Sequence, residues 1–383
     1  MKAPLVSVAM VTCNVERFLA EAIESILNQT FRDFEFIIVD FGSADASPSI
    51  IRRYQEKDGR VQFDVIPHCN LSEARNDCCF RASGKYLALL DADDVAFPDR
   101  LAHQVDYLEG HPEVGILGGG IELIDEAGRR VGAVINVADD AKLRKALLSS
   151  SPFCASTIMM RTDTFRAAGG YRRAFADASE DYDLWQRVME RCRGAKLTEA
   201  VAQYRYHPDQ IGARRLRELS IGECVVRASR RIRSQGKTDP VDSADSITPQ
   251  LVSELGISEV ELQNALLKWY YNRVLNVQRI NPGGSTLPLV NEMLAVLAES
   301  RHAANAVAAE TWFAASRAYW GRGDALNACR AVFKAQAICP SFAAKLVGRA
   351  ARRLTQLLIR RGSMIPTAYL HSSHGPNGAT TQR

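Results

Sequence analysis

The chain has 383 residues, of which 46% are hydrophobic and 24% are charged, and its formal net charge is +4. This balance is typical of a folded protein and excludes a mainly disordered or collagen-like chain, while the small net charge indicates no nucleic-acid partner. The length predicts two domains.

No uncharged apolar run reaches the roughly 18 to 20 residues that a membrane-spanning helix needs, and the N-terminus does not resemble a signal peptide. We therefore expect a cytoplasmic protein. Nine cysteines without a CxxC pair predict reduced thiols and no zinc site.

The first hundred residues alternate strand-like and helix-like segments. A helix is predicted where apolar residues recur at spacings of three and four between Phe18 and Leu27, and a second is predicted over 72–81. Short apolar runs rich in β-branched and aromatic residues predict four buried strands, at 5–11, 34–39, 61–66 and 86–90. The alternation predicts an α/β fold with a doubly wound, mostly parallel sheet.

Polar residues follow three of these strands. Because ligands bind beyond the carboxyl ends of strands in such sheets, Asn14, Asp40 and Asp91 are expected to share one crevice. In the sequence Asp91-Ala92-Asp93-Asp94, alternation turns Asp91 and Asp93 to the same side, where they could bind one divalent cation together with phosphate oxygens and water. An Asp-rich turn before a helix is the structural alternative.

Two further segments carry candidate chemistry. The sequence 70–76 places Arg75 on a helix that leads into the fourth strand, and its guanidinium suits a diphosphate. Glu180 and Asp181 open an apolar-periodic helix. Acidic residues at a helix start are usually caps, but a carboxylate here could also act as a general base whose pKa is shifted by its acidic neighbour.

The chain changes character after about residue 234. The polar, turn-rich stretch 236–250 predicts a linker without packed elements, which separates a first domain at 1–235 from a smaller all-α domain at 251–370. Within the second domain, residues from Trp312 to Pro340 match the spacing of one tetratricopeptide-like helical pair. An ordinary helical hairpin fits the spacing about as well.

The last part of the chain is basic. From Ala325 onward it contains nine Lys and Arg residues and no Asp or Glu. Residues 344–361 divide into a basic and an apolar stripe, which is consistent with peripheral contact to an anionic membrane or with packing on the helical domain. Residues 371–383 are typical of a disordered tail.

Seven segments occur in a fixed order between residues 4 and 212: VSVAMVTCN, IESILNQTF, FEFIIVDFGSAD, NLSEARN, YLALLDADD, SEDYDLWQRV and YRYHPDQIG. Together they resemble the family 2 glycosyltransferases, which have the GT-A fold. The resemblance implies a metal-dependent, inverting transfer of a hexosyl-type sugar from a nucleotide-diphosphate sugar to an acceptor hydroxyl. It also implies a glycan or lipid-linked acceptor in surface polysaccharide or glycoconjugate assembly, and it does not extend to the helical domain.

The resemblance assigns roles to residues at the strand ends. Thr12 and Asp40 would line the pocket for the nucleobase and ribose, Arg75 would reach the base or the diphosphate, and Asp91 would contact the nucleotide sugar. The family usually has a second Asp where this chain has Phe41, and Phe41 could stack on the base instead. Cys13 replaces the usual aromatic residue after Thr12. Both departures bear on the identity of the donor.

The same resemblance assigns the reacting groups. Asp93 would bind Mn²⁺ or Mg²⁺, with His207 as a second ligand, and Asp181 would be the catalytic base beside the substrate-binding residue Glu180. The alternative is a non-catalytic relative that binds a nucleotide sugar or glycan and uses its helical domain as an interaction module. A nicotinamide enzyme is not indicated, because the first strand is not followed by a GxGxxG turn.

Overall fold

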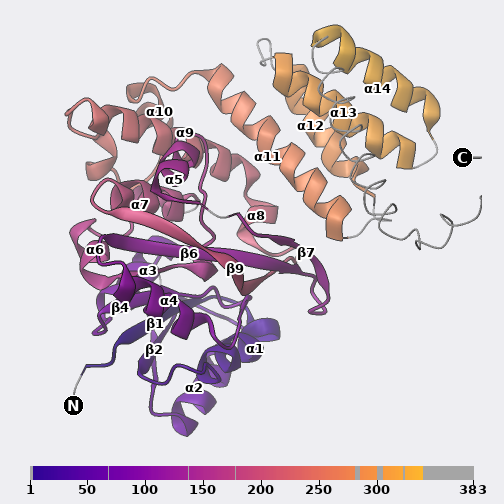
Figure 1. The fold of residues 1–383 in the computed structure, drawn as a ribbon. Coiled ribbons are helices and arrows are strands. Elements are labelled where there is room, and N and C mark those ends of the chain that lie inside the picture. Colours follow the sequence, from indigo (N-terminus) through magenta and orange to yellow (C-terminus); the bar gives the residue numbers. More distant parts are fainter. Residues whose placement is uncertain are drawn as a thin grey trace, which may run out of the picture.

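The computed structural model describes residues 3–339 except 68, 137, 177, 281–284, 300–304 and 322–323. The segments 344–361 and 371–383, for which a basic helix and a disordered tail are predicted, lie outside the described residues. In the described part, one nine-stranded sheet has the order β3-β2-β1-β4-β8-β6-β9-β5, with β7 added beside β6. Helices cover both faces of this sheet, and a group of helices extends from one end of it (Figure 1).

The first half of the sheet is parallel, and its strands are close to the predicted ones. They are β1 (Val6–Thr12), β2 (Phe34–Asp40), β3 (Val61–Val65) and β4 (Tyr86–Leu89). Thr12 lies opposite Asp40 in the register of β1 and β2, so the ends of these two strands are level. The strands are continuous apolar runs because both faces of the sheet are buried.

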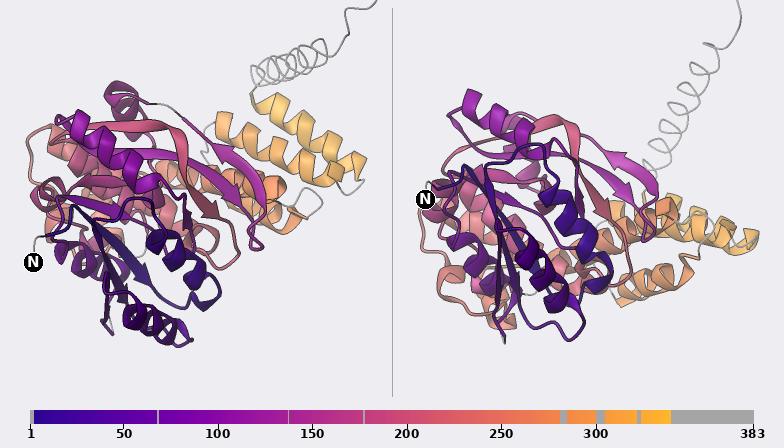
Figure 2. Two further views of the ribbon diagram at one scale, coloured as in Figure 1. Left: turned by 60° about the horizontal axis from the view of Figure 1, so that its bottom comes forward. Right: turned by 90° about the horizontal axis from the view of Figure 1, so that it is seen from below.

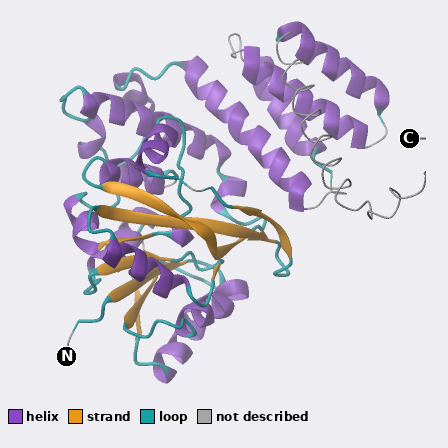
Figure 3. Cartoon of the chain, viewed as in Figure 1, coloured by secondary structure: helices purple, strands orange, loops and turns teal. Residues whose placement is uncertain are grey.

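Helices complete two hydrophobic cores, one on each face. The helix α1 (Glu16–Leu27) buries Phe18, Leu19 and Ile23, and it shares a core with α2 (Ser47–Lys57) and α4 (Arg100–Gly110). The opposite face is covered by α3 (Leu71–Phe80). A capping box starts α3, because Asn70 and Glu73 each accept a hydrogen bond from the backbone N–H of the other. Figure 3 shows the helices on the two sides of the strands.

The second half of the sheet mixes strand directions. The strand β8 (Met159–Arg161) is antiparallel to both β4 and β6 (Val114–Ile124), whereas β9 (Arg193–Arg205) is parallel to β6. The strands β5 (Val95–Ala96) and β7 (Arg130–Val134) form antiparallel pairs at the margins. The predicted α/β class is therefore confirmed, with a sheet that is parallel in its N-terminal half.

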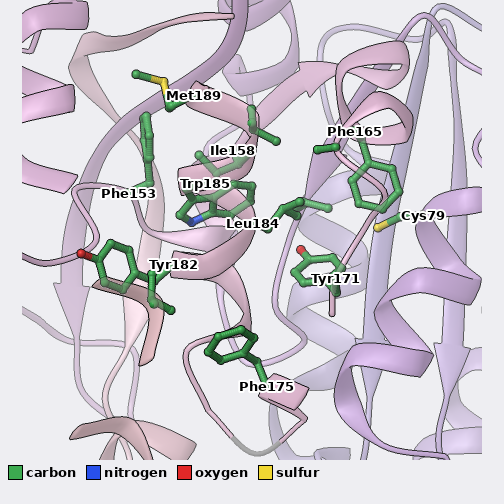
Figure 4. Close-up of a cluster of buried hydrophobic side chains, with 14 of the residues drawn as sticks. Cys79, Phe153, Ile158, Phe165, Tyr171, Phe175, Tyr182, Leu184, Trp185 and Met189 are labelled. Atoms are coloured by element: carbon green, nitrogen blue, oxygen red, sulfur yellow. The ribbon is translucent and has the colours of Figure 1, made fainter. Parts of the chain in front are cut away.

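A second set of helices packs on this mixed region. It consists of α5 (Asp140–Leu147), the 3-10 turn at Ala155–Thr157, α6 (Thr162–Ala167), the 3-10 turn at Arg173–Phe175 and α7 (Glu180–Met189). Trp185 of α7 is fully buried, and its ring lies edge-on to Phe153 with centroids 6.2 Å apart. Figure 4 shows this core around Trp185. The core fixes the start of α7, where Glu180 and Asp181 stand.

The stretch 236–250 is not the unpacked linker that its composition predicts. After α8 (Ile211–Arg214) and α9 (Leu216–Ser234), the chain forms a 3-10 turn at Pro240–Ser243 and then α10 (Pro249–Glu254). Val241 is 1% exposed and belongs to the main core. Buried Asp239 accepts hydrogen bonds from Arg172 and Arg233, both at 2.8 Å. Polar composition misled the prediction because these polar groups are paired inside the protein.

The remaining described helices are α11 (Glu259–Ile280), α12 (Leu287–Glu299), α13 (Asn305–Gly321) and α14 (Ala325–Ile338). They pack side by side and project from the sheet (Figure 2). In α13 and α14 the small residues Ser316, Ala328 and Ala335 are buried. In the described part of the chain, no helix is long and apolar enough to cross a lipid bilayer.

Candidate active site

A cavity of about 730 Å³ opens at the carboxyl ends of β1, β2 and β4. Its lining brings together most of the residues singled out in the sequence: Phe41, Arg75, Asp91, Asp93, Glu180, Asp181 and His207. These residues come from the loops after β2 and β4, from α3, from the start of α7 and from the segment after β9. Asp93 and Asp181, which are 88 positions apart by their numbers, thus face one shared space.

Thr12 and Asp40 lie beneath the cavity surface and are each 1% exposed. The Thr12 hydroxyl donates to Asp40 Oδ2 at 2.9 Å, and Asp40 Oδ1 accepts from the backbone N–H groups of Gly42 and Ser43. This pair shapes the loop after β2. The cavity lining at this edge is made of Cys13, Asn14 and Phe41 instead. The sequence does not show which of these residues form the lining and which lie beneath it, because this depends on how deeply each strand end is buried.

Asn14 holds the two loops of this edge together. It has a φ of 54°, in the left-handed region that Asn tolerates better than most residues. Its side-chain Oδ1 accepts a hydrogen bond from the Ala44 backbone at 2.8 Å, and its own N–H donates to Ser43 Oγ at 2.8 Å. The loops after β1 and β2 are therefore joined where Phe41 enters the cavity.

Arg75 is the electrostatic centre of the site. Its guanidinium contacts Asp181 Oδ1 at 2.8 Å, Asp91 Oδ1 at 3.1 Å and Glu180 Oε1 at 3.6 Å. The side chain is only 11% exposed, so these charges attract each other more strongly than a surface pair would. In the structure Arg75 thus orients three carboxylates from two separate elements, a role that the sequence does not indicate.

Asp181 lies in the first turn of α7, after Ser179 in the left-handed conformation with a φ of 69°. Burial, together with the negative charges of Glu180 and Asp91, raises the pKa of Asp181 to about 7 against the opposing effect of Arg75. Its carboxyl group would therefore exchange protons near neutral pH. A general base is most effective when its pKa lies near the working pH.

The close approach of α9 to the start of α7 depends on Gly222. A Cβ at this position would lie 2.7 Å from Ser179 Oγ and 2.9 Å from the Ala178 carbonyl oxygen. No side chain fits at such distances. Gly222 therefore allows α9 to support the turn that presents Glu180 and Asp181.

Asp93 and His207 form the other candidate pair. Asp93 Oδ2 and His207 Nε2 lie 2.9 Å apart, and the His207 ring packs against Phe18 with centroids at 5.0 Å. Within the described ranges, no group of three or more His, Cys, Asp or Glu side chains is arranged for a metal ion. The pair fits a cation for which the protein supplies one oxygen and one nitrogen, with phosphate oxygens and water completing the shell.

The neighbouring Asp94 does not reach the cavity. It is 1% exposed and accepts hydrogen bonds from the Ser156 hydroxyl and from the backbone N–H of Arg205 at 2.8 Å. Burial, together with the charges of Asp93 and Asp91, raises the pKa of Asp94 well above its usual range. Asp94 thus links the loop after β4 to the end of β9, which carries His207.

Comparison with known proteins identifies the family. Residues 7–169 match the model described as glycosyl transferase family 2. The Bacillus subtilis protein EpsE is 35% identical over 236 residues, which cover 60% of this chain and 84% of EpsE. The chain belongs to glycosyl transferase family 2. The O-antigen biosynthesis glycosyltransferase WbnJ of Escherichia coli is 32% identical over 53% of this chain and 80% of WbnJ.

The GT-A fold is the one expected for the family, and this glycosyltransferase has a sheet that is parallel in its N-terminal half. Among solved structures, S. aureus TarS 1–349 with UDP-GlcNAc aligns over 89% of this chain and 92% of the 1–349 chain, with a TM-score of 0.48 and 14% identity. The Pyrobaculum calidifontis mannosyltransferase PcManGT with GDP-Man and Mn²⁺ aligns over 88% and 87%, with a TM-score of 0.46 and 15% identity. Such scores transfer no residue roles.

Part of the cavity of this glycosyltransferase comes from beyond the region that matches the family model. It is also lined by Tyr204 near the end of β9, by Tyr206 just after β9, and by Trp269, Asn272, Arg273 and Asn276 of α11. The α11 residues were not predicted, because nothing in their spacing indicates that a helix of the C-terminal region reaches the strand ends. For Tyr206 the available signal was its position directly before His207.

Proposed function

We propose that this glycosyltransferase moves a sugar from a nucleotide-diphosphate donor to an acceptor hydroxyl with inversion at the anomeric carbon. The observation that carries the proposal is that Asp93 and Asp181 line the same cavity. One carboxylate would serve the leaving diphosphate, and the other would take the proton of the nucleophile. A cavity of about 730 Å³ has room for a sugar between them.

In the proposed step, the acceptor oxygen attacks the anomeric carbon as the bond from that carbon to the diphosphate oxygen breaks. Asp181 takes the proton of the acceptor hydroxyl, because a hydroxyl is a poor nucleophile until its proton is removed. Attack from the face opposite the leaving group inverts the anomeric centre. Arg75 holds Asp181 and Asp91 in position through contacts of 2.8 and 3.1 Å.

The reaction also requires stabilisation of the leaving group. Asp93 and His207 would hold Mn²⁺ or Mg²⁺, which when bound neutralises the charge that develops on the departing diphosphate. Phe41 and Cys13 line the part of the cavity next to the ends of β1 and β2. We assign this part to the nucleobase, which would stack on the Phe41 ring.

The relatives suggest the biological setting. WbnJ is named for O-antigen biosynthesis, and AmsE of Erwinia amylovora, which is 26% identical over 51% of this chain and 74% of AmsE, is named for amylovoran biosynthesis. We therefore propose that the acceptor is a glycan or a lipid-linked saccharide in the assembly of a surface polysaccharide.

The test is a screen of nucleotide sugars for slow hydrolysis and for transfer, with Mn²⁺, with Mg²⁺ and with chelator. We expect one donor to be consumed in a metal-dependent reaction. Asp181→Ala and Asp93→Ala should each reduce turnover by a factor of about 100 or more. The proposal is wrong if both variants retain wild-type turnover. Metal-independent binding without turnover in every arm would instead favour a non-catalytic binding protein.

A further inference from the structure

The helix α11 supplies one side of the cavity, although it lies outside the residues that match the family model. It is anchored to the end of β9, because the side-chain amide of Asn276 donates a hydrogen bond to the Tyr206 hydroxyl. The Arg273 guanidinium carbon also lies 5.9 Å from the centroid of the Tyr206 ring. Figure 1 shows α11 running past the end of the sheet. The contribution of α11 to the cavity is thus fixed by specific contacts.

The charges in the cavity are unevenly paired. Of the described residues that line it, two are arginines. Arg75 forms ion pairs with three carboxylates through its two terminal nitrogens, although its Nε has no hydrogen-bond partner among the described residues. Two further carboxylates of the cavity lining also have cationic neighbours. Glu223 pairs with Arg227, and Asp209 pairs with Arg214. None of the carboxylates described in the structure forms an ion pair with Arg273. Its Nε is buried and lacks a hydrogen-bond partner among the described residues.

The Arg273 guanidinium thus lacks an anionic partner among the described residues, and its buried Nε costs on the order of 1 to 3 kcal/mol as a donor without a hydrogen bond. An oxyanion that enters the cavity would supply the anionic partner, because a guanidinium binds carboxylate and phosphate through parallel hydrogen bonds. The neighbouring groups on α11 suit a sugar. The Trp269 ring offers an apolar face for a pyranose, and the amides of Asn272 and Asn276 can bind hydroxyl groups.

We propose that α11 forms the acceptor subsite, and that it selects an acceptor whose sugar carries an oxyanion, either a carboxylate or a phosphate. The inference rests on the proposed function, since it names the class of acceptor. Trp269 would pack on the acceptor sugar, and Arg273 would bind its anionic group. The donor then occupies the side of the cavity formed by Cys13, Phe41 and Asp93.

The experiment measures binding, so that it does not depend on turnover. The full chain is saturated with Mn²⁺ and a nucleoside diphosphate, UDP or GDP, to fill the donor side. It is then titrated with methyl α-glucoside, with methyl α-glucuronide and with methyl α-glucoside 6-phosphate at low salt. We expect at least one anionic glycoside to bind about tenfold more tightly than the neutral glycoside. The carboxylate and phosphate arms show which anion is preferred.

Two variants assign the effect. Arg273→Gln should abolish the preference for the anionic glycoside, whereas Arg317→Gln, which removes the same charge from an exposed position on α13, should retain it. Equal binding of neutral and anionic glycosides, or a preference that survives Arg273→Gln, overturns the inference. A loss of nucleoside diphosphate binding in Arg273→Gln also overturns it, because Arg273 would then belong to the donor side.

The outcome is separable from that of the proposed function. If the wild-type protein shows the preference but consumes no nucleotide sugar, the subsite stands and the catalytic proposal fails. If it turns over donor but binds all three glycosides equally, the subsite fails and the catalytic proposal stands.

Discussion

The ionisation of Asp181 decides when the site can act. Its carboxyl group is half-buried in the cavity beside Glu180 and Asp91, and its pKa rises to about 7 even though Arg75 contacts it at 2.8 Å. The structure thus balances two opposing needs. Arg75 holds the carboxylate in place, and the negative neighbours keep it basic enough to take a proton.

We predict that kcat/KM falls as the pH drops below about 7, because a protonated Asp181 cannot accept a proton. Glu180→Gln removes one negative neighbour. It should therefore lower the pKa of Asp181 and move the acid limb of the profile to lower pH. Donor hydrolysis followed from about pH 5 to about pH 9 measures both profiles. An acid limb at the same pH in wild type and Glu180→Gln would contradict this assignment.

Single residues differ in how far the sequence reveals them. Asp93 and Asp181 stand in recognisable motifs, and both line the cavity. Thr12 and Asp40 also stand in motifs, yet they are buried beneath the cavity. The contacts of Arg273 with Tyr206 join residues far apart in the chain. Motif spacing indicates which residue types are present, but depth and long-range contacts are properties of the packed chain.

At the scale of elements, the helix α3 links local sequence to the site. The capping box of Asn70 and Glu73 satisfies backbone N–H groups at the start of α3. Arg75 lies two positions after Glu73 in the same helix. The direction of the Arg75 side chain therefore depends on how the first turn is fixed.

We predict that Asn70→Ala lowers the free energy of unfolding by about 1 kcal/mol and also lowers kcat, because the first turn of α3 no longer holds Arg75 in place. The matched control is Asp139→Ala, which removes the N-cap hydrogen bond to Lys142 at the start of α5. It should cost a similar amount of stability and leave kcat unchanged. Urea unfolding and donor hydrolysis distinguish the two effects. Equal kcat values in both variants would show that the cap does not position Arg75.

The strands of the first half were predictable because each is a continuous apolar run between polar turns, and β1 to β4 begin and end within a residue or so of the predicted limits. The short strand β8 was not predicted. It has three residues and gains its place by antiparallel pairing with β4 and β6, which nothing in its own sequence indicates. A continuous apolar run in the sequence identifies a strand that is buried on both faces. The formation of a short strand such as β8 depends instead on the strands with which it pairs.

At the scale of the whole molecule, a buried ion network joins α7 to α9 and to the stretch 236–250. Arg172, before the second 3-10 turn, pairs with Asp183 of α7 and with Asp239 of the stretch 236–250. Ser229 and Arg233 of α9 also bind Asp239. We therefore propose that the catalytic domain extends through this stretch instead of ending at residue 235, and that the helical domain begins with α11.

Burial alone would raise the pKa of Asp239, but the hydrogen bond from Ser229 and the charge of Arg172 lower it to about 2. A carboxyl group with a lowered pKa in the folded state stabilises that state above its unfolded pKa near 4, and the contribution disappears as the pH falls through about 2. The shift corresponds to about 2 kcal/mol of stability at neutral pH. We predict that Asp239→Asn lowers the free energy of unfolding by at least this amount at pH 7 and weakens its dependence on pH between about 4 and about 2.

The control for this prediction is Asp242→Asn. Asp242 pairs with the same arginine at 2.9 Å, but its side chain is 61% exposed, so its loss should change stability by less than about 1 kcal/mol. Urea unfolding at a series of pH values measures both variants. If Asp239→Asn unfolds like the control, the network does not hold the stretch 236–250 against α7 and α9. The boundary of the catalytic domain would then return to residue 235.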